Sequence, residues 1–167
     1  MTLNNKQIKT LANLMRIPSV SCIFDEDIDL SKKTGYAILN LGDTIRGGTH
    51  WVACAWRSKE FIYFDSFCQP WSKAVTKELK RQKYTKKGYV DCHAIQDLNS
   101  SLCGWFSLYF LWYIHNKGND MYNSANDFTE LFSEDTDGNS KKLQMLFIEQ
   151  FGNLLPQQLK NILLFEK

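Results

Sequence analysis

The sequence predicts an α+β fold: a central mixed sheet flanked by helices, with a cysteine at the N-terminus of a buried central helix. Three observations lead to this prediction. The run from Trp105 to Ile114 is apolar and aromatic on nearly every side, which indicates a helix inside a domain. Segments 49–56 and 61–67 are apolar and joined by a polar turn, as is typical of an antiparallel pair of strands. Amphipathic helical patterns occupy 4–15 and 140–152.

The other elements follow from the same patterns, taken in chain order. The basic amphipathic segment 71–83 predicts a helix, a short helix is expected at 126–132, and 159–165 is a last apolar segment beyond Pro156. Further strands are expected at 35–42 and 89–95. Glycine-rich or charged stretches predict a turn at 43–48 and surface loops at 25–33 and 133–140.

Length and composition limit the class of protein. A chain of 167 residues can bury one core, so residues 1–167 are expected to form a single domain. Hydrophobic residues make up 44% of the chain, which favours a globular protein over a disordered one. A net charge of +2 argues against a dedicated nucleic-acid binder. The apolar helix is shorter than the ~20 residues that a bilayer span needs, so no membrane association is expected.

The cysteine pattern argues for reduced thiols in an intracellular compartment. The number of cysteines is odd and their spacing is irregular, and the chain shows no signal peptide. No Cys-x-x-Cys pair occurs, so no structural metal site is expected. The five positions are Cys22, Cys54, Cys68, Cys92 and Cys103.

Cys103 has the placement of a nucleophile, because it lies at the first turn of the apolar helix. Amide N–H groups and the positive end of the helix dipole favour a thiolate there. Gln96 lies seven residues earlier, and its side-chain amide becomes a donor close to the sulfur if the loop folds back. Taken alone, a buried cysteine is more often a small hydrophobic residue of the core.

Asp65 interrupts an aromatic strand, where a lone carboxylate is costly to bury unless it is paired. An imidazole on the neighbouring strand is the natural partner, and His50 stands at the start of that strand. His93 is a weaker rival because it lies only three residues before Gln96. The alternative for Asp65, an exposed position at a strand end, is equally consistent with this feature on its own.

Together these residues supply the parts of a cysteine-nucleophile site. Such a site needs a base, a group that orients the base, and donors for the oxyanion. His50, Asp65, Gln96 and the helix N-terminus at Cys103 match these roles in chain order.

The segments GGTHWVACAW, FIYFDSF and QDLNSSLCGWFSLYFL resemble the adenovirus maturation protease (adenain) and related Ulp-type cysteine proteases. The resemblance implies that His50 is the general base, Asp65 its orienting partner and Cys103 the nucleophile. The Gln96 side chain and the Cys103 backbone N–H would form the oxyanion hole. Trp51 and Gly104 would support the site or contact substrate.

The same resemblance implies a viral endopeptidase that forms an acyl-enzyme and needs no metal. Its substrates would be capsid or other structural precursors, cut at Gly-containing sites after small residues. A monomer located in the infected cell and in virions is the corresponding expectation.

Three departures from the adenoviral pattern point to a virus of the virophage or polinton-like kind. Asp65 stands where adenoviral enzymes mostly have glutamate. Cys92 does not match the cysteine that binds the adenoviral peptide cofactor, and the region before Gln96 is shorter. An activating peptide is therefore not carried over. Contact with DNA, the other adenoviral cofactor, rests only on a basic cluster: Lys77, Lys80, Arg81, Lys83, Lys86 and Lys87.

Three alternatives remain open. A protease that removes ubiquitin-like or SUMO-type modifiers would use the same residues on a Gly-Gly tail. An acyltransferase shares the order histidine, acid, cysteine. An inactive binding module would keep the fold, but such a protein has no need of all four residues.

Overall fold

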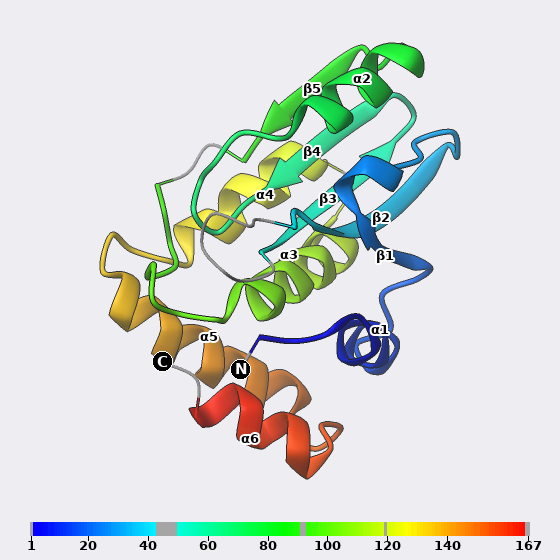
Figure 1. Cartoon of the computed structure of the whole chain (residues 1–167). Helices are drawn as coiled ribbons and strands as arrows, with labels where there is room; N and C mark the ends of the chain where they lie inside the picture. The colour runs from blue at the N-terminus through cyan, green and yellow to red at the C-terminus, as the bar shows by residue number, and fades with distance from the viewer. Residues whose placement is uncertain (1, 43–49, 91–92, 119, 166–167) are drawn as a thin grey trace.

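A five-stranded mixed sheet forms the centre of the molecule in the computed structural model, which describes residues 2–42, 50–90, 93–118 and 120–165 (Figure 1). The spatial order of the strands follows the sequence. The outer pairs β1–β2 and β4–β5 are parallel, whereas β2–β3 and β3–β4 are antiparallel. The strands are β1 Val20–Phe24, β2 Thr34–Asn40, β3 Trp51–Arg57, β4 Glu60–Phe64 and β5 Lys86–Tyr89.

Helices cover both faces of this sheet, unequally. The long helix α3 lies on one face and packs along β3, together with α1, α4 and α5. The other face is covered by α2 and by residues 25–33. The helices are α1 Asn5–Leu14, α2 Lys73–Arg81, α3 Cys103–Lys117, α4 Met121–Glu130, α5 Thr136–Phe151 and α6 Gln157–Phe165, with a short 3-10 turn at Asp25–Asp27. The predicted α+β class with a mixed sheet and a buried central helix is confirmed.

The β3–β4 hairpin decides which residues meet at the site. Its register places Ala53 opposite Phe64, so the start of β3 lies beside the end of β4. Both strands are buried along nearly their whole length because α3 covers one face and α2 the other. His50 immediately precedes β3 and Asp65 immediately follows β4, so the two side chains come to the same edge of the sheet.

Two strand predictions were wrong. The sequence analysis predicts no strand at Val20–Phe24, yet this segment forms β1. It expects a strand at 89–95, but β5 spans Lys86–Tyr89, and Val90 onward is not in a strand in the described part. The first two residues of β5 are lysines, which suit an edge strand because their charges discourage pairing with another chain. The turn expected at 43–48 lies outside the described residues.

Two loops and one helix also differ from the prediction. Helix α4 begins at Met121 because the Asp120 carboxylate caps its first turn, so it starts well before 126. Helix α5 begins at Thr136 inside the predicted loop 133–140, capped by Asp135. Segment 25–33 is not only a surface loop, since it buries Ile28 and Leu30 against the sheet.

Cys22, Cys54 and Cys103 are free thiols in the described part of the chain, whereas Cys92 lies outside the described residues. In the described ranges, no helix combines the length and apolar character needed to cross a membrane.

Candidate active site

The structure places Cys103 at the first position of α3, as the sequence predicts. The preceding residue, Leu102, has no side-chain oxygen and gives the helix no side-chain cap. The first N–H groups of a helix have no partner within the helix, so those at the start of α3 can bind an anion. The residue is nevertheless 96% buried, with an exposed fraction of 4%. A small reactive atom at an uncapped helix N-terminus is therefore the first component of the site.

His50 and Asp65 form a direct pair next to this helix end. The Nε2 atom of His50 lies 2.8 Å from Oδ1 of Asp65. The Asp65 side chain is almost fully buried and the His50 side chain is 15% exposed. The Nδ1 atom of His50 has no hydrogen-bond partner among the described residues, although Cys103 is close enough to affect the titration of the ring. The nitrogen not engaged by Asp65 is thus the one available to exchange a proton with sulfur.

The backbone just after β4 fixes the orientation of Asp65. Its Oδ1 atom also accepts a hydrogen bond from the Phe67 backbone N–H at 2.8 Å, and its backbone carbonyl accepts from the Cys68 N–H at 2.8 Å. Cys68 adopts φ 56°, which closes this tight turn. The ring of Phe67 lies against the imidazole of His50, with ring centres 4.7 Å apart. One short turn therefore orients the carboxylate and shields the imidazole.

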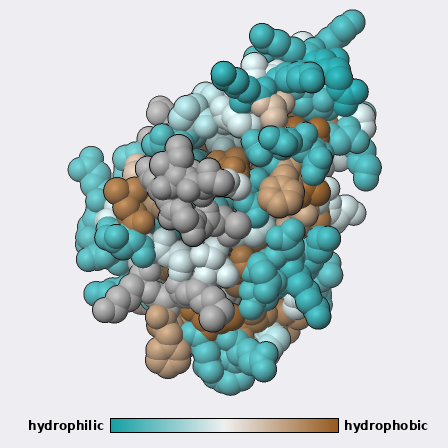
Figure 2. Space-filling model, viewed as in Figure 1, coloured by the Kyte–Doolittle hydropathy of each residue, from teal (hydrophilic) through white to brown (hydrophobic). Residues whose placement is uncertain are grey.

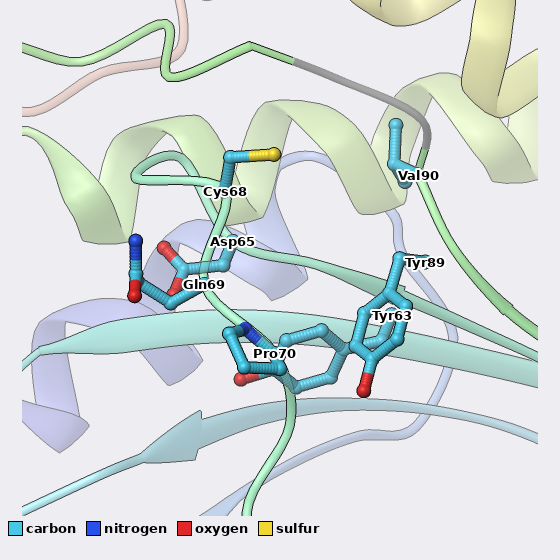
Figure 3. A pocket seen from close by; sticks show the side chains of 7 residues that line it. All are labelled: Tyr63, Asp65, Cys68, Gln69, Pro70, Tyr89 and Val90. Atoms are coloured by element: carbon cyan, nitrogen blue, oxygen red, sulfur yellow. The ribbon is translucent and has the colours of Figure 1, made fainter.

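A cavity of about 430 Å³ opens beside Asp65 (Figure 3). Its lining includes Tyr63, Asp65, Cys68 and Tyr89, but not His50, Gln96 or Cys103. Figure 3 shows the Cys68 sulfur directed toward Val90 across the top of this cavity. The Oδ2 atom of Asp65 and the hydroxyl of Tyr63 have almost no exposed area and no partner in the described chain. The cavity therefore reaches the site through Asp65, while His50, Gln96 and Cys103 are not among its lining residues.

The pair has a marked electrostatic consequence for His50. Burial lowers the pKa of the imidazole, but the hydrogen bond to Asp65 and the nearby Cys103 sulfur, together with the negative charges of both groups, more than offset this and raise the pKa from 6.5 to about 9. The imidazolium form is therefore the stable one at neutral pH, which suits an ion pair with a cysteine thiolate.

This shift predicts a pH dependence of stability. The folded pKa of His50 exceeds the unfolded value, so its contribution to stability is fully present below about pH 6.5 and disappears as pH rises through about 9. We expect the free energy of unfolding of the wild type to fall over this interval by roughly 1–3 kcal/mol more than that of His50→Gln. Urea titrations from pH 6 to 10 measure the difference, and parallel curves for the two proteins would contradict it.

The structure holds Gln96 in a network of buried contacts. Its Nε2 atom donates to the Ser100 carbonyl at 2.8 Å, and its Oε1 atom accepts from the Ser66 hydroxyl at 2.6 Å. Gln96 is 2% exposed. The hydrogen bond to Ser100 turns the Gln96 side chain toward the part of the loop that leads into α3, and Ser100 lies three residues before Cys103.

Trp51 and Gly104 take a supporting position. The Trp51 indole is 1% exposed, and its Nε1 donates to the Leu3 carbonyl at 2.8 Å. A Cβ atom on Gly104 would lie 3.2 Å from Cδ1 of Leu3 and 3.3 Å from Cδ1 of Trp51. Leu3 and Trp51 therefore leave little room for a side chain at Gly104. Because it is almost fully buried, Trp51 supports the site by packing against Gly104.

The remaining candidates lie elsewhere. His93 is exposed and lines a separate cavity with Asn126 and Glu130.

Hydrophilic side chains gather over the end of the molecule that carries α2 and β5 (Figure 2). This end contains the exposed basic cluster Lys77, Lys80, Arg81, Lys83, Lys86 and Lys87. Arg81 already pairs with Glu78, and Lys86 with Glu60. The described residues contain no group of three or more metal-ligating side chains.

The sequence analysis missed three residues of the site's surroundings: Leu3, Ser66 and Ser100. Leu3 packs on Trp51 and Gly104, and the two serines bind the Gln96 side chain. The only available signal for Ser66 was its place directly after Asp65 in a strand otherwise rich in aromatic residues.

The arrangement supplies the parts of a nucleophilic site. A cysteine at an uncapped helix N-terminus, an imidazole beside it and a buried carboxylate on the far ring nitrogen are the components that nucleophilic catalysis by cysteine needs.

Comparison with known proteins gives a family match over part of the chain and a shared fold. The family model described as adenovirus endoprotease matches residues 21–87, a range that contains His50 and Asp65 but not Gln96 or Cys103. Two crystal structures of the ASFV pS273R protease, one with selenomethionine, match with TM-scores of 0.60 and 0.57 at 16% identity. Each match covers 85% of this chain, which spans 66% of the ASFV protein.

A structure of the SUMO protease Ulp1 with its catalytic cysteine oxidised to a sulfinic acid also matches. Its TM-score is 0.46 at 16% identity, over 74% of this chain and 72% of that one. A search of curated protein sequences gives no match. The chain is thus similar to the adenovirus endoprotease family over residues 21–87 and shares its fold with the ASFV pS273R protease.

Proposed function

We propose that the protein is a viral maturation endopeptidase that cleaves capsid or other structural precursors through Cys–His–Asp catalysis. The observation that supports this most directly is the 2.8 Å contact between His50 Nε2 and Asp65 Oδ1, beside a cysteine at an uncapped helix N-terminus. The viral family model and the ASFV protease fold support a viral role.

In the proposed mechanism, the Cys103 thiolate attacks the carbonyl carbon of the scissile peptide bond. The π electrons move to the carbonyl oxygen, which the Cys103 N–H and the Gln96 amide stabilise. His50 imidazolium gives its proton to the leaving amine, and an acyl-enzyme remains. Neutral His50 then takes a proton from water, which attacks the thioester and releases the acid and the thiolate. Asp65 keeps Nε2 protonated and the ring correctly oriented throughout.

The proposal needs no resident metal for this chemistry. It includes cleavage after small residues at Gly-containing sites, action as a monomer, and location in the infected cell and virion. An activating peptide and contact with DNA through the basic cluster are further possibilities for the same site, and each would appear as a rise in turnover on addition of the ligand.

A peptide library made from a digested proteome tests the substrate class, with new termini identified by mass spectrometry and Cys103→Ala as the control. We expect Cys103-dependent cleavage that selects glycine next to the scissile bond. Preferential hydrolysis of a ubiquitin-like protein carrying a C-terminal fluorophore would instead indicate deconjugation. Labelling of Cys103 by acetyl-CoA without peptide cleavage would indicate acyl transfer. Absence of any Cys103-dependent reaction would contradict the proposed function.

A further inference from the structure

Ser66 contacts Gln96 through both its side chain and its backbone. The Ser66 hydroxyl lies 2.6 Å from Gln96 Oε1. The Ser66 carbonyl accepts hydrogen bonds from the backbone N–H groups of Ile95 at 2.9 Å and Gln96 at 3.1 Å. Ser66 is 1% exposed and Gln96 is 2% exposed, so water does not compete for these bonds. Ser66 thus makes three buried hydrogen bonds to residues 95 and 96.

The orientation of the Gln96 amide follows from the chemistry of its partners. The Ser100 carbonyl can only accept a hydrogen bond, so the amide nitrogen of Gln96 must face it, at 2.8 Å. The amide oxygen must then face Ser66, whose hydroxyl has to donate. One N–H of the Gln96 amide remains without a protein acceptor within the described chain. This N–H is the group that can reach a substrate oxygen.

A second element holds the same loop from the opposite side. The side chain of Asn139, on α5, donates from Nδ2 to the carbonyl of Ile95 at 3.0 Å. Asn139 is 2% exposed. The backbone before Gln96 is therefore fixed on both sides, which leaves rotation of the Gln96 side chain as the freedom that the Ser66 hydroxyl removes.

We propose that Ser66 is a positioning residue that fixes the Gln96 amide as the oxyanion donor, an assignment that rests on the proposed function. Asp65 and Ser66 are adjacent in one turn after β4, so this turn orients both the base and the oxyanion donor. Asp65 acts on His50 and Ser66 acts on Gln96. A preorganised donor stabilises charge only where it is already aimed, so loss of the Ser66 hydroxyl weakens the acyl-transfer step.

Three measurements on Ser66→Ala separate this role from a general loosening of the site. Alkylation of Cys103 by iodoacetamide needs the thiolate but forms no oxyanion. Turnover of a peptide identified in the library does form one. Binding of a Gly-Gly-terminated peptide aldehyde also places an oxygen there, because the thiolate adds to the carbonyl and His50 protonates the resulting oxygen.

We expect Ser66→Ala to lower kcat and aldehyde affinity by about 10–100-fold, comparable with the loss of one oxyanion donor or less. The alkylation rate should stay within about twofold of the wild type. The double variant Ser66→Ala with Gln96→Ala should be no slower than Gln96→Ala alone, because both changes remove one function. Ser124→Ala, at a buried serine of α4, is the matched control and should change none of the three measurements.

Equal losses in alkylation and turnover, unchanged turnover, or additive losses in the double variant would each overturn the assignment. Ser66→Cys keeps a weaker donor of similar size. It should lower kcat and aldehyde affinity less than Ser66→Ala does and leave the alkylation rate unchanged, so it replaces Ser66→Ala if alanine prevents folding. If the wild type cleaves no peptide, the proposed function fails by itself. Aldehyde affinity then decides the role of Ser66, and an unchanged affinity in the variant overturns it.

Discussion

Cys103→Ala is expected to abolish peptide cleavage, with a decrease in kcat of at least about 10⁴-fold. The proposed mechanism routes every turnover through a thioester on this sulfur, and Cys103 is close enough to His50 to affect the titration of the imidazole. The fold should survive because alanine is smaller than cysteine and suits a helix. Progress curves on a peptide from the library give the rate, and thermal unfolding checks the fold.

Cys22→Ala provides the matched control for this change. Cys22 is a buried thiol of β1, and burial raises its pKa, so it is a poor nucleophile. Activity should persist in Cys22→Ala even if its stability falls slightly. Substantial hydrolysis by Cys103→Ala would exclude Cys103 as the nucleophile and remove the basis of the proposed mechanism.

Asp65→Asn should reduce kcat by roughly 10²–10⁴-fold. The amide removes the negative charge that helps to raise the pKa of His50, and it no longer fixes which imidazole nitrogen carries the proton. We expect the alkaline limb of the pH–rate profile near pH 9 in the wild type, from the pKa of His50, and at lower pH in Asp65→Asn. Initial rates from pH 5 to 10 measure both effects.

Asp29→Asn tests whether the effect is specific to the site. Asp29 is an exposed carboxylate whose nearest cation, Arg81, lies 3.9 Å away. An exposed pair of this kind contributes little to stability, and activity should not change. A wild-type rate and pH profile in Asp65→Asn would show that the carboxylate is not needed to orient His50.

The sequence identified the core of the site because unusual residues stood in conspicuous places. A carboxylate within FIYFDSF is expensive to bury without a partner, and together with His50 at the start of the neighbouring strand that cost suggested a pair. The structure places Asp65 against His50 as this argument requires. Cys103 stood out because it lies where the long apolar run begins, and the structure starts helix α3 at this residue.

Other features depend on contacts that a linear pattern does not show. Ser66 and Leu3 are ordinary residues in the sequence, and only folding places them against Gln96 and Gly104. Strand β5 reads as charged because two of its residues are lysines at the edge of the sheet. The polar segment at 133–140 reads as a loop, yet the Asp135 cap allows helix α5 to begin inside it. Tertiary context thus overrides local propensity in these places.

The reactivity of Cys103 across pH is the most direct test of the central claim, that a thiolate–imidazolium pair exists in this protein. The measurement is iodoacetamide labelling of the wild type and of His50→Ala between pH 5 and 10, with modified peptides quantified by mass spectrometry. Cys22 and Cys54 serve as internal references because burial raises the pKa of both thiols.

We predict that Cys103 of the wild type reacts well below pH ~8.5, where a free thiol ionises, and that His50→Ala loses this reactivity. The two reference cysteines should stay slow in both proteins. Labelling of Cys103 no faster than that of Cys22 or Cys54 in the wild type would contradict the existence of the pair.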